Sequence, residues 1–339
     1  MKFEQLWERD LHVAVNPHSV CLAETEGAVF LTERASHISK VDLFSGKTLW
    51  SQSVPGIGGW TSFADNKLYY ASQGEGLFVF DGKSGEDLAQ ITPSFPSTGY
   101  IIVNENIIVT GGWRGYTDLQ AYDINTFEKM WSVPLSSPDI QSISIPAFNG
   151  PNSLVLAHHS LQEILVINTI TGIIENKIEM PHELYCPDLG RSYQTVDEQL
   201  VFPATDGALY TLDKQCSHLV CEELDINVMK PAKPMIDRDN IILKQDEDSL
   251  SLYNRREKRI QWNFDIAHNP WDEVFAAKLE ENTFILAGSY GQLKVISDGK
   301  ELVTSLKTEK RITTQLLLAD NIIIYGTKGA IKAISYTPR

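Results

Sequence analysis

The segment HISKVDLFSGKTLW, residues 37–50, decides the fold class of this chain. It reads as a strand of alternating apolar and polar residues that ends at Asp42, a turn containing Ser-Gly-Lys, and a second strand that ends in a tryptophan. Alternation with a period of two indicates a β-strand, and Gly, Asn or Asp between two such runs indicates a hairpin. The segment therefore predicts a β-hairpin that can be sought elsewhere in the chain.

Related hairpins recur along the whole sequence. The polar residues that end the first strand of each copy are Asp42, Asp81, Asp123, Asn168, Asp213, Asn254, Ser297 and Ser335. Successive positions are 38 to 45 residues apart, which is room for about four short strands, and no segment shows a sustained helical period. Units of this kind are the blades of a β-propeller. We predict an all-β, eight-bladed propeller of four-stranded antiparallel sheets, with seven blades as the alternative if the last copy is degenerate.

The two ends of the chain are predicted to share one blade. The last copy stops after its third strand, while Leu6-Trp7 matches Leu49-Trp50 in the fourth-strand position. We expect residues 3–11 to complete the last blade, which would leave no open strand edge. Residues 1–339 are then one propeller domain, with blades at about 12–54, 60–91, 97–133, 140–178, 186–225, 233–265, 272–306, and 311–336 plus 3–11.

The unit x-V-x-D-x-x-[TS]-G-K-x-x-W, seen best in SKVDLFSGKTLW at residues 39–50, resembles the PQQ-like β-propeller repeat. Quinoprotein alcohol dehydrogenases and the propeller lipoprotein of the outer-membrane barrel-assembly machine share that repeat. The resemblance implies that the Asp satisfies turn amides and that the Trp packs between adjacent blades. Copies two, four and five depart from it and carry Ala89, Asn176 and Cys221 in place of the Trp, and copy seven, with a shorter turn, has Thr304. The adjacent cysteines, calcium site and long inserted loops that PQQ chemistry implies are missing from the sequence, so neither PQQ nor another cofactor is expected.

Net charge and composition limit the classes of partner that the chain can bind. The chain has 29 Lys and Arg against 44 Asp and Glu, a net charge of −15, which repels nucleic acid and anionic lipid. No apolar run has the roughly 18 residues of a membrane span, and the first residues do not read as a signal peptide. We therefore expect a cytoplasmic monomer that binds neither nucleic acid nor membrane, or a periplasmic or secreted one if a signal peptide has been removed. The four cysteines show no Cys-x-x-Cys spacing and are expected to be buried or inert thiols.

The two kinds of loop in each blade differ in chemistry. Turns between first and second strands, and between third and fourth strands, are plain Gly, Asn and Asp turns, whereas the second-to-third loops and the crossovers between blades are irregular and rich in Trp, His and Arg. Such loops on a rigid scaffold usually carry binding. The candidate ligand-binding residues are Trp60, Tyr100, Trp113, Arg114, Tyr116, His159, Tyr185, Arg191, His268 and Trp271. For Trp60, Tyr100 and Trp271, which begin first strands, the alternative is that they plug the central channel or pack between blades.

These residues favour a non-catalytic binding or scaffolding propeller that engages a protein, peptide or small ligand on its irregular loops. The alternative is an enzyme of the lyase, hydrolase or cyclase type, with or without a metal, that acts on a small molecule at the mouth of the central channel. Its catalytic residues would be scattered over several blades, with His158, His182, Tyr193 and Asp272 as the candidates. No metal site is expected: His158 and His159 would point in opposite directions on a strand, and only in a loop could both turn toward one metal.

Overall fold

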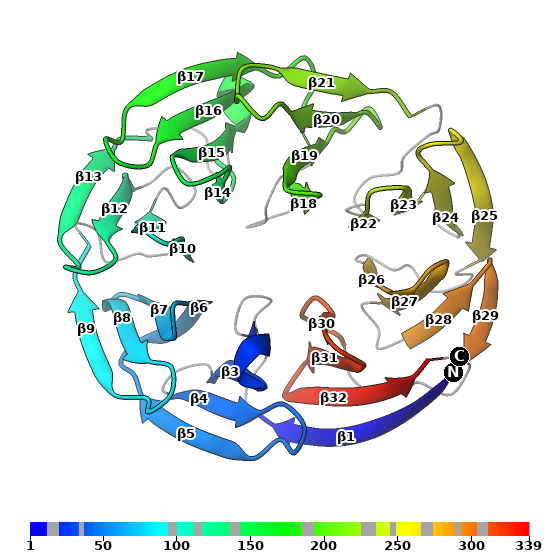
Figure 1. Cartoon of the computed structure of the whole chain (residues 1–339), viewed down its shortest axis with the longest axis horizontal. Coiled ribbons are helices and arrows are strands. Elements are labelled where there is room, and N and C mark those ends of the chain that lie inside the picture. Colours follow the sequence, from blue (N-terminus) through cyan, green and yellow to red (C-terminus); the bar gives the residue numbers. More distant parts are fainter. Residues whose placement is uncertain are drawn as a thin grey trace. The chain divides into compact units, whose positions relative to one another are not determined.

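The computed structural model describes residues 1–11, 20–33, 37–93, 100–111, 117–135, 143–184, 193–224, 235–244, 249–265, 274–288, 293–303 and 311–338. Within these ranges the strands form eight four-stranded antiparallel sheets, and helical structure is limited to short 3-10 turns (Figure 1). The fold class is an all-β, eight-bladed β-propeller, which confirms the prediction from the repeat. We number the sheets as blades 1 to 8 in chain order.

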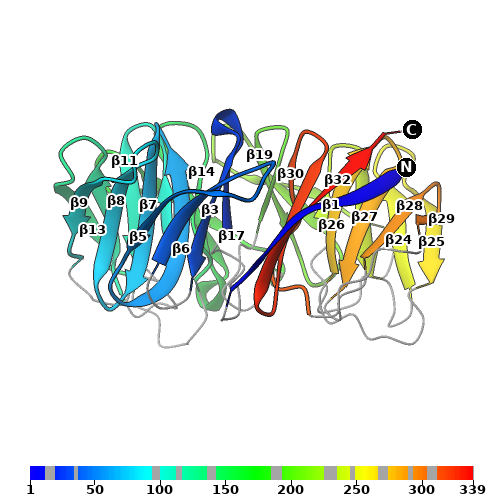
Figure 2. The ribbon, with the colours of Figure 1, turned by 90° about the horizontal axis from the view of Figure 1, so that it is seen from below.

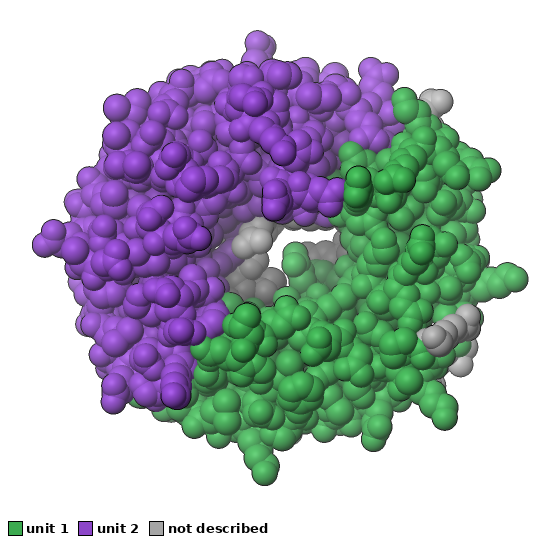
Figure 3. Space-filling model, viewed as in Figure 1, with its two compact units in different colours: residues 1–58, 228–339 green, residues 59–227 purple. Residues whose placement is uncertain are grey.

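Contacts divide the chain into two compact units (Figure 3). Unit 1 comprises residues 1–58 and 228–339, and unit 2 comprises residues 59–227. The expectation of a single domain stays a prediction.

Unit 1 holds four blades. Blade 1 consists of β2 (Val20–Ala23), β3 (Ala28–Glu33), β4 (His37–Asp42) and β5 (Thr48–Ser53), with the 3-10 turn η1 (Glu24–Glu26) after β2. Blade 6 consists of β22 (Met235–Ile236), β23 (Asn240–Lys244), β24 (Ser249–Asn254) and β25 (Arg259–Asp265). Blade 7 consists of β26 (Val274–Glu280), β27 (Thr283–Gly288), β28 (Leu293–Ser297) and β29 (Lys300–Val303). Blade 8 consists of β30 (Leu317–Ala319), β31 (Ile322–Thr327), β32 (Ala330–Thr337) and β1 (Lys2–Asp10).

Unit 2 holds the other four. Blade 2 consists of β6 (Ile57–Ala64), β7 (Lys67–Gln73), β8 (Gly76–Asp81) and β9 (Asp87–Ile91). Blade 3 consists of β10 (Ile101–Val103), β11 (Ile107–Gly111), β12 (Leu119–Asp123) and β13 (Lys129–Val133). Blade 4 consists of β14 (Ala147–Phe148), β15 (Ser153–His158), β16 (Glu163–Asn168) and β17 (Ile174–Glu179), with the 3-10 turn η3 (His159–Leu161) after β15. Blade 5 consists of β18 (Gln194–Val196), β19 (Gln199–Pro203), β20 (Leu209–Leu212) and β21 (Leu219–Glu222).

The N-terminal strand completes blade 8, as predicted. β1 pairs antiparallel with β32 from Lys2 opposite Thr337 to Asp10 opposite Ala330, and Figure 2 shows the two strands side by side. Trp7 lies opposite Ala333, in the fourth-strand position that the repeat assigns to it. The pairing covers the β32 edge, which would otherwise be open to another chain.

A β-bulge precedes the Trp position in the outer strand of seven of the eight blades within the described residues. At each bulge the pairing with the third strand skips one residue of the fourth: Leu49, Leu88, Met130, Glu175, Gln261, Leu302 and Leu6. A bulge re-aims the side chains beside it. Leu49 is accordingly 54% exposed, whereas Trp131, which follows the skipped Met130, is buried at 8%. Blade 5, whose third-to-fourth turn differs, pairs without a register shift.

The repeated Asp or Asn organises the turn that follows it. The side-chain oxygen of Asp42 accepts the backbone N–H of Ser45 at 2.7 Å, Asp123 accepts that of Thr126 at 2.8 Å, and Asn168 accepts that of Thr171 at 3.0 Å. These bonds satisfy turn amides that strand pairing leaves free. Hydrogen bonds from the side chain and amide of Ser45 hold the pKa of Asp42 below its usual value. The structural role implied for the repeated polar residue is therefore confirmed.

The Trp of one blade lies over the turn of the next. Trp131 in β13 covers Gly172 of blade 4, where an added Cβ would lie 2.7 Å from the Trp131 ring, and its indole N–H donates to the Thr169 carbonyl at 2.8 Å. Trp7 repeats this arrangement on blade 1, over Gly46 and with the Leu43 carbonyl at 2.8 Å. Each such joint closes a seam between two blades.

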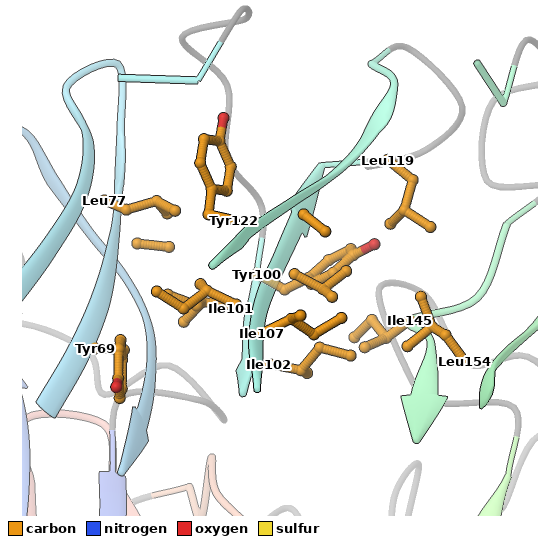
Figure 4. Packing of buried hydrophobic residues seen from close by; sticks show 14 of the residues in the cluster. Tyr69, Leu77, Tyr100, Ile101, Ile102, Ile107, Leu119, Tyr122, Ile145 and Leu154 are labelled. Atoms are coloured by element: carbon orange, nitrogen blue, oxygen red, sulfur yellow. The ribbon is translucent and has the colours of Figure 1, made fainter. Parts of the chain in front are cut away.

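The largest core cluster of unit 2 fills the space between blades 2, 3 and 4. Figure 4 shows Tyr69 and Leu77 on one side, Tyr100 and Ile107 in the middle, and Leu154 on the other. Within the described residues no strand of one of these blades pairs with a strand of another, so the cluster joins the three blades through side-chain packing.

Candidate functional site

The crossover from blade 4 to blade 5, residues 180–184, is held between two loops of unit 2. The Met180 amide donates to the Gln162 carbonyl of the β15–β16 loop at 2.8 Å. On the other side, the Thr205 amide in the β19–β20 turn donates to the Glu183 carbonyl at 2.9 Å, and Leu184 forms a β-bridge with Ala204. Residues 158–162, 180–184 and 204–208 thus form one connected surface at the irregular ends of two neighbouring blades. We call it the clamped crossover surface.

His158 shapes the first of these loops from within. Its side chain is 3% exposed, and its Nδ1 accepts the Leu161 amide of η3 at 3.4 Å, which caps the 3-10 turn. Burial lowers the pKa of His158. The chain then leaves the turn through Gln162, whose φ of 51° is left-handed. This arrangement favours a structural role for His158, and it presents Leu161 to solvent with 57% of its surface exposed.

His159 lies between the loop and the crossover. Burial lowers its pKa to about 4, the negative charge of Glu183 opposes that shift, and His158 adds to it. The imidazole is therefore neutral near pH 7 and can act as a hydrogen-bond donor and acceptor at once. Glu183 of the crossover is therefore close enough to His159 of the blade 4 loop for its charge to act on the imidazole.

His182 and Asp206 meet on the outside of the same surface. The His182 Nε2 lies 3.4 Å from Asp206 Oδ2, and the other oxygen of Asp206 accepts the Ala208 amide at 3.0 Å. The imidazole stacks on the Tyr210 ring, with centroids 6.4 Å apart and an interplanar angle of 29°. Burial raises the pKa of Tyr210, and a hydrogen bond with Cys221 and the charge of Asp206 raise it further. The carboxylate and the phenol ring together fix the orientation of a half-exposed imidazole.

The aromatic candidates at first strands are packed inside unit 2. Trp60 and Tyr100 are 6% and 3% exposed, with ring centroids 6.3 Å apart in an edge-to-face arrangement. Burial raises the pKa of Tyr100 well above its usual value, and the nearby phenol of Tyr193 adds to this. The Tyr193 hydroxyl donates to the Pro146 carbonyl at 3.0 Å, which ties the start of blade 5 to blade 4. Trp60 and Tyr100 thus pack against each other in the core between blades 2 and 3, whereas Tyr193 packs in a second cluster with Phe202.

The remaining candidates lie outside the described residues: Trp113, Arg114, Tyr116, Tyr185, Arg191, His268, Trp271 and Asp272. Sequence reasoning missed Leu161, Glu183 and Asp206, which the structure places beside His159 and His182. Asp206 is part of a Thr-Asp-Gly turn that looks like ordinary turn chemistry. Because second-to-third loops and crossovers were predicted to lie at the same end of each blade, the sequence could have placed Asp206 near His182.

The clamped crossover surface combines one exposed apolar side chain with an oriented imidazole and two carboxylates. Among the described residues no group of three or more His, Cys, Asp and Glu side chains is placed to hold a metal ion. In the same part of the chain, no helix has the length and apolar character needed to cross a membrane. Cys21, Cys216 and Cys221 are free thiols.

Comparisons with known proteins agree with the fold. A family sequence profile described as outer membrane protein assembly factor BamB matches residues 34–264. A search of curated proteins finds no match to the chain. BamB from Moraxella catarrhalis superposes with a TM-score of 0.71 at 13% identity over 99% of this chain and 100% of that one. Sqt1 from Saccharomyces cerevisiae gives 0.72 at 12% identity over 98% and 99% of the two chains. A europium-containing methanol dehydrogenase gives 0.65 at 10% identity over 98% and 93%.

Proposed function

Because the chain belongs to the family of the outer membrane protein assembly factor BamB, we propose that it is a non-catalytic scaffold that binds a protein partner in an assembly system of that kind. The structural neighbours share only the fold, since their identities of 10 to 13% are too low to carry an activity. The partner-binding role is therefore argued from the clamped crossover surface.

One observation carries the proposal: backbone hydrogen bonds on both sides make this irregular surface rigid. A rigid loop loses little conformational entropy on binding, which leaves more of the contact energy for affinity. Leu161, 57% exposed, supplies an apolar contact, and the stacked His182 supplies an oriented polar one beside Glu183 and Asp206. Apolar centres surrounded by polar side chains are typical of protein interfaces.

The test places a photo-crosslinking amino acid at position 161 and, in a matched control, at Ile173. Ile173 is 62% exposed and lies in the β16–β17 turn, at the plain end of the same blade. In cells of the source organism we expect position 161 to crosslink to one defined protein of the outer-membrane assembly system, and position 173 not to. Leu161→Glu should reduce co-purification of that protein at least tenfold, and Ile173→Glu should leave it unchanged. Equal crosslinking at both positions, or none at 161, would contradict the proposal.

The same preparation tests where the protein acts. Fractionation of the cells distinguishes the cytoplasmic expectation from the periplasmic one. A partner found in one compartment and the chain in another would also count against the proposed role.

The alternative, an enzyme, is supported by one observation, the pair of His182 Nε2 and Asp206 Oδ2 at 3.4 Å. A carboxylate that orients an imidazole is the usual arrangement of a general base. The test is a panel of ester, lactone and lyase substrates assayed with the native chain and with His182→Gln. The enzyme would be favoured if the native chain turned over a substrate with a pH profile that follows an imidazole and the variant did not. If neither protein turned over any substrate, or both did so equally, this support would be removed.

A further inference from the structure

Arginine is concentrated at one end of blade 6. The chain has ten arginines in 339 residues, and four of them, Arg238, Arg255, Arg256 and Arg259, fall within 22 consecutive positions. The meander order of blade 6 brings them together, because the β22–β23 turn and the β24–β25 turn lie at the same end of the sheet. Residues 237–239 and 255–259 carry five basic and three acidic side chains, in a chain whose net charge is −15. We call these two turns the basic turn pair.

The two turns are fastened to each other by Arg255. Its backbone amide donates to the Asp239 carbonyl at 2.8 Å, and its Nη1 donates to the Asp237 carbonyl at 3.2 Å. The Asp237 side chain in turn accepts the Asn240 amide at 2.6 Å and lies 3.1 Å from the Lys278 Nζ of blade 7. The basic turn pair is therefore a built surface rather than two independent mobile turns.

Each of the two outer arginines lies beside a carboxylate. Arg256 approaches Asp239 through its Nε at 2.6 Å, and Arg259 approaches Glu257 through its Nε at 2.7 Å. The two arginine side chains nevertheless remain 66% and 70% exposed. A guanidinium has five N–H donors in a planar fork, and a carboxylate can bind two of them at once. The hydrogen bond of the Arg259 Nε to Glu257 fixes the plane of that fork, and the exposure of both side chains leaves N–H donors for a second carboxylate.

We propose that the basic turn pair is a docking surface for a short acidic segment of a partner protein. The size of the basic region decides the kind of partner, because a charge is felt over only about 8 Å at physiological salt. An anionic membrane or a nucleic acid is an extended surface and would bring its charge against the acidic remainder of the chain. A run of a few Asp or Glu residues covers the basic turn pair alone and offers the planar carboxylates that arginine binds in bidentate geometry.

The experiment uses the whole chain and a synthetic peptide of about ten glutamates, with a glutamine peptide of the same length as the control, at roughly 50 mM salt. We expect the glutamate peptide to bind and to be released as the salt concentration rises. The double variant Arg256→Gln with Arg259→Gln should bind it about tenfold more weakly. The matched control, Lys83→Gln with Lys214→Gln, removes the same charge from exposed positions in unit 2 and should bind like the native chain.

Folding and the competing partners are tested in the same series. Circular dichroism and thermal melting verify that each variant is folded, and Lys258→Glu provides a second change at the centre of the β24–β25 turn with the same expected loss. Failure of the native chain to bind the glutamate peptide would overturn the proposal. So would equal binding by the Arg256→Gln, Arg259→Gln variant, or binding only to phosphatidylglycerol vesicles or duplex DNA. None of these outcomes bears on the Leu161 crosslinking result, because the two surfaces lie on different blades.

Discussion

The joint between blades 3 and 4 and the joint between blades 2 and 3 are built from equivalent strands but are filled in opposite ways. In the first, Trp131 on the outer strand covers Gly172 in the next turn. In the second, Ala89 stands at the Trp position, opposite Val79 as Trp131 is opposite Ala121, and Phe127 stands at the Gly position. Phe127 adopts a left-handed φ of 60°, unusual for a bulky residue, and packs with Ala89 against the same core cluster.

The difference shows that the joint requires a filled volume and not a particular residue. An aromatic ring on the strand needs a turn without a side chain, and a small residue on the strand leaves room for an aromatic ring on the turn. The joint between blades 4 and 5 uses a polar solution instead, in which the Asn176 amide donates to the Cys216 carbonyl at 2.9 Å. The three joints are therefore closed by three different pairs of residues.

The largest expected effect is the loss of the ring at the first joint. Trp131→Ala removes a buried indole and its hydrogen bond to Thr169 and should lower the free energy of unfolding by about 3–5 kcal/mol. Chemical denaturation of the native and variant chains measures it. Leu88→Ala, at an exposed bulge position of blade 2, is the control and should change stability by less than about 0.5 kcal/mol. If Trp131→Ala also lowered the free energy of unfolding by less than about 0.5 kcal/mol, the joint would not depend on the indole.

A double-mutant cycle tests whether the second joint can be converted into the first. Phe127→Gly alone leaves a cavity beside Ala89, and Ala89→Trp alone places two rings in one space, so each should cost about 2–3 kcal/mol. The double variant restores the Trp-over-Gly arrangement and should recover most of that loss, which gives a coupling energy of about 2 kcal/mol or more. Purely additive losses would mean that the two positions do not share one seam.

The two ends of blade 4 should differ in how their stability depends on pH. The Trp131 indole bonds to the Thr169 carbonyl, which does not titrate. His159, at the other end of blade 4, is neutral near pH 7 in the folded chain, with a pKa of about 4 against about 6.5 when unfolded. The unfolded chain then binds more protons, so the stabilisation is complete above pH 6.5 and is lost as the pH falls toward 4. Between pH 7.5 and 5 we expect a loss of about 1–2 kcal/mol, allowing for partial exposure of the group.

The measurement compares denaturation curves of the native chain and of His159→Gln at the two pH values. Between pH 7.5 and 5, the free energy of unfolding of His159→Gln should fall by about 1–2 kcal/mol less than that of the native chain. Ile173→Ala, which changes an exposed residue without a titratable group at the other end of blade 4, is the control and should keep the native pH dependence. Identical pH dependence in all three chains would rule out His159 as the source.

The smallest effect concerns the indole nitrogen. Trp262 covers Gly299 of blade 7, but the turn there is a two-residue Asp298-Gly299 turn with φ of 49° and 76°. In the longer turns of blades 1 and 4, the carbonyls of Leu43 and Thr169 accept the indole N–H. The short turn of blade 7 offers no such carbonyl, and within the described residues the buried Trp262 indole N–H has no hydrogen-bond partner. Trp262→Phe should therefore cost about 1 kcal/mol less than Trp131→Phe in the same denaturation assay. Equal costs would show that the hydrogen bond to Thr169 adds nothing.

Much of the candidate site was beyond prediction from sequence. His159 and His182 were singled out as loop residues rich in chemistry, but their partners Glu183 and Asp206 come from other loops, and no local pattern marks them. Trp60 and Tyr100 look the same in sequence whether they face a ligand or a neighbouring blade. Only the contacts show that their rings pack against each other inside unit 2.

The sequence by itself determined the fold class, the number of blades, the pairing of β1 with blade 8 and the role of Asp42 and its equivalents. Each of these depends on a local signal, such as alternation, a turn residue or a spacing of 38 to 45 positions, that repeats along the chain. The tertiary structure alone decided how each seam between blades is filled, which aromatic residues are buried and which loops meet at the clamped crossover. Those features depend on contacts between residues that the chain holds some 20 to 40 positions apart, as Trp131 and Thr169 are, and such contacts are set by packing rather than by any local pattern.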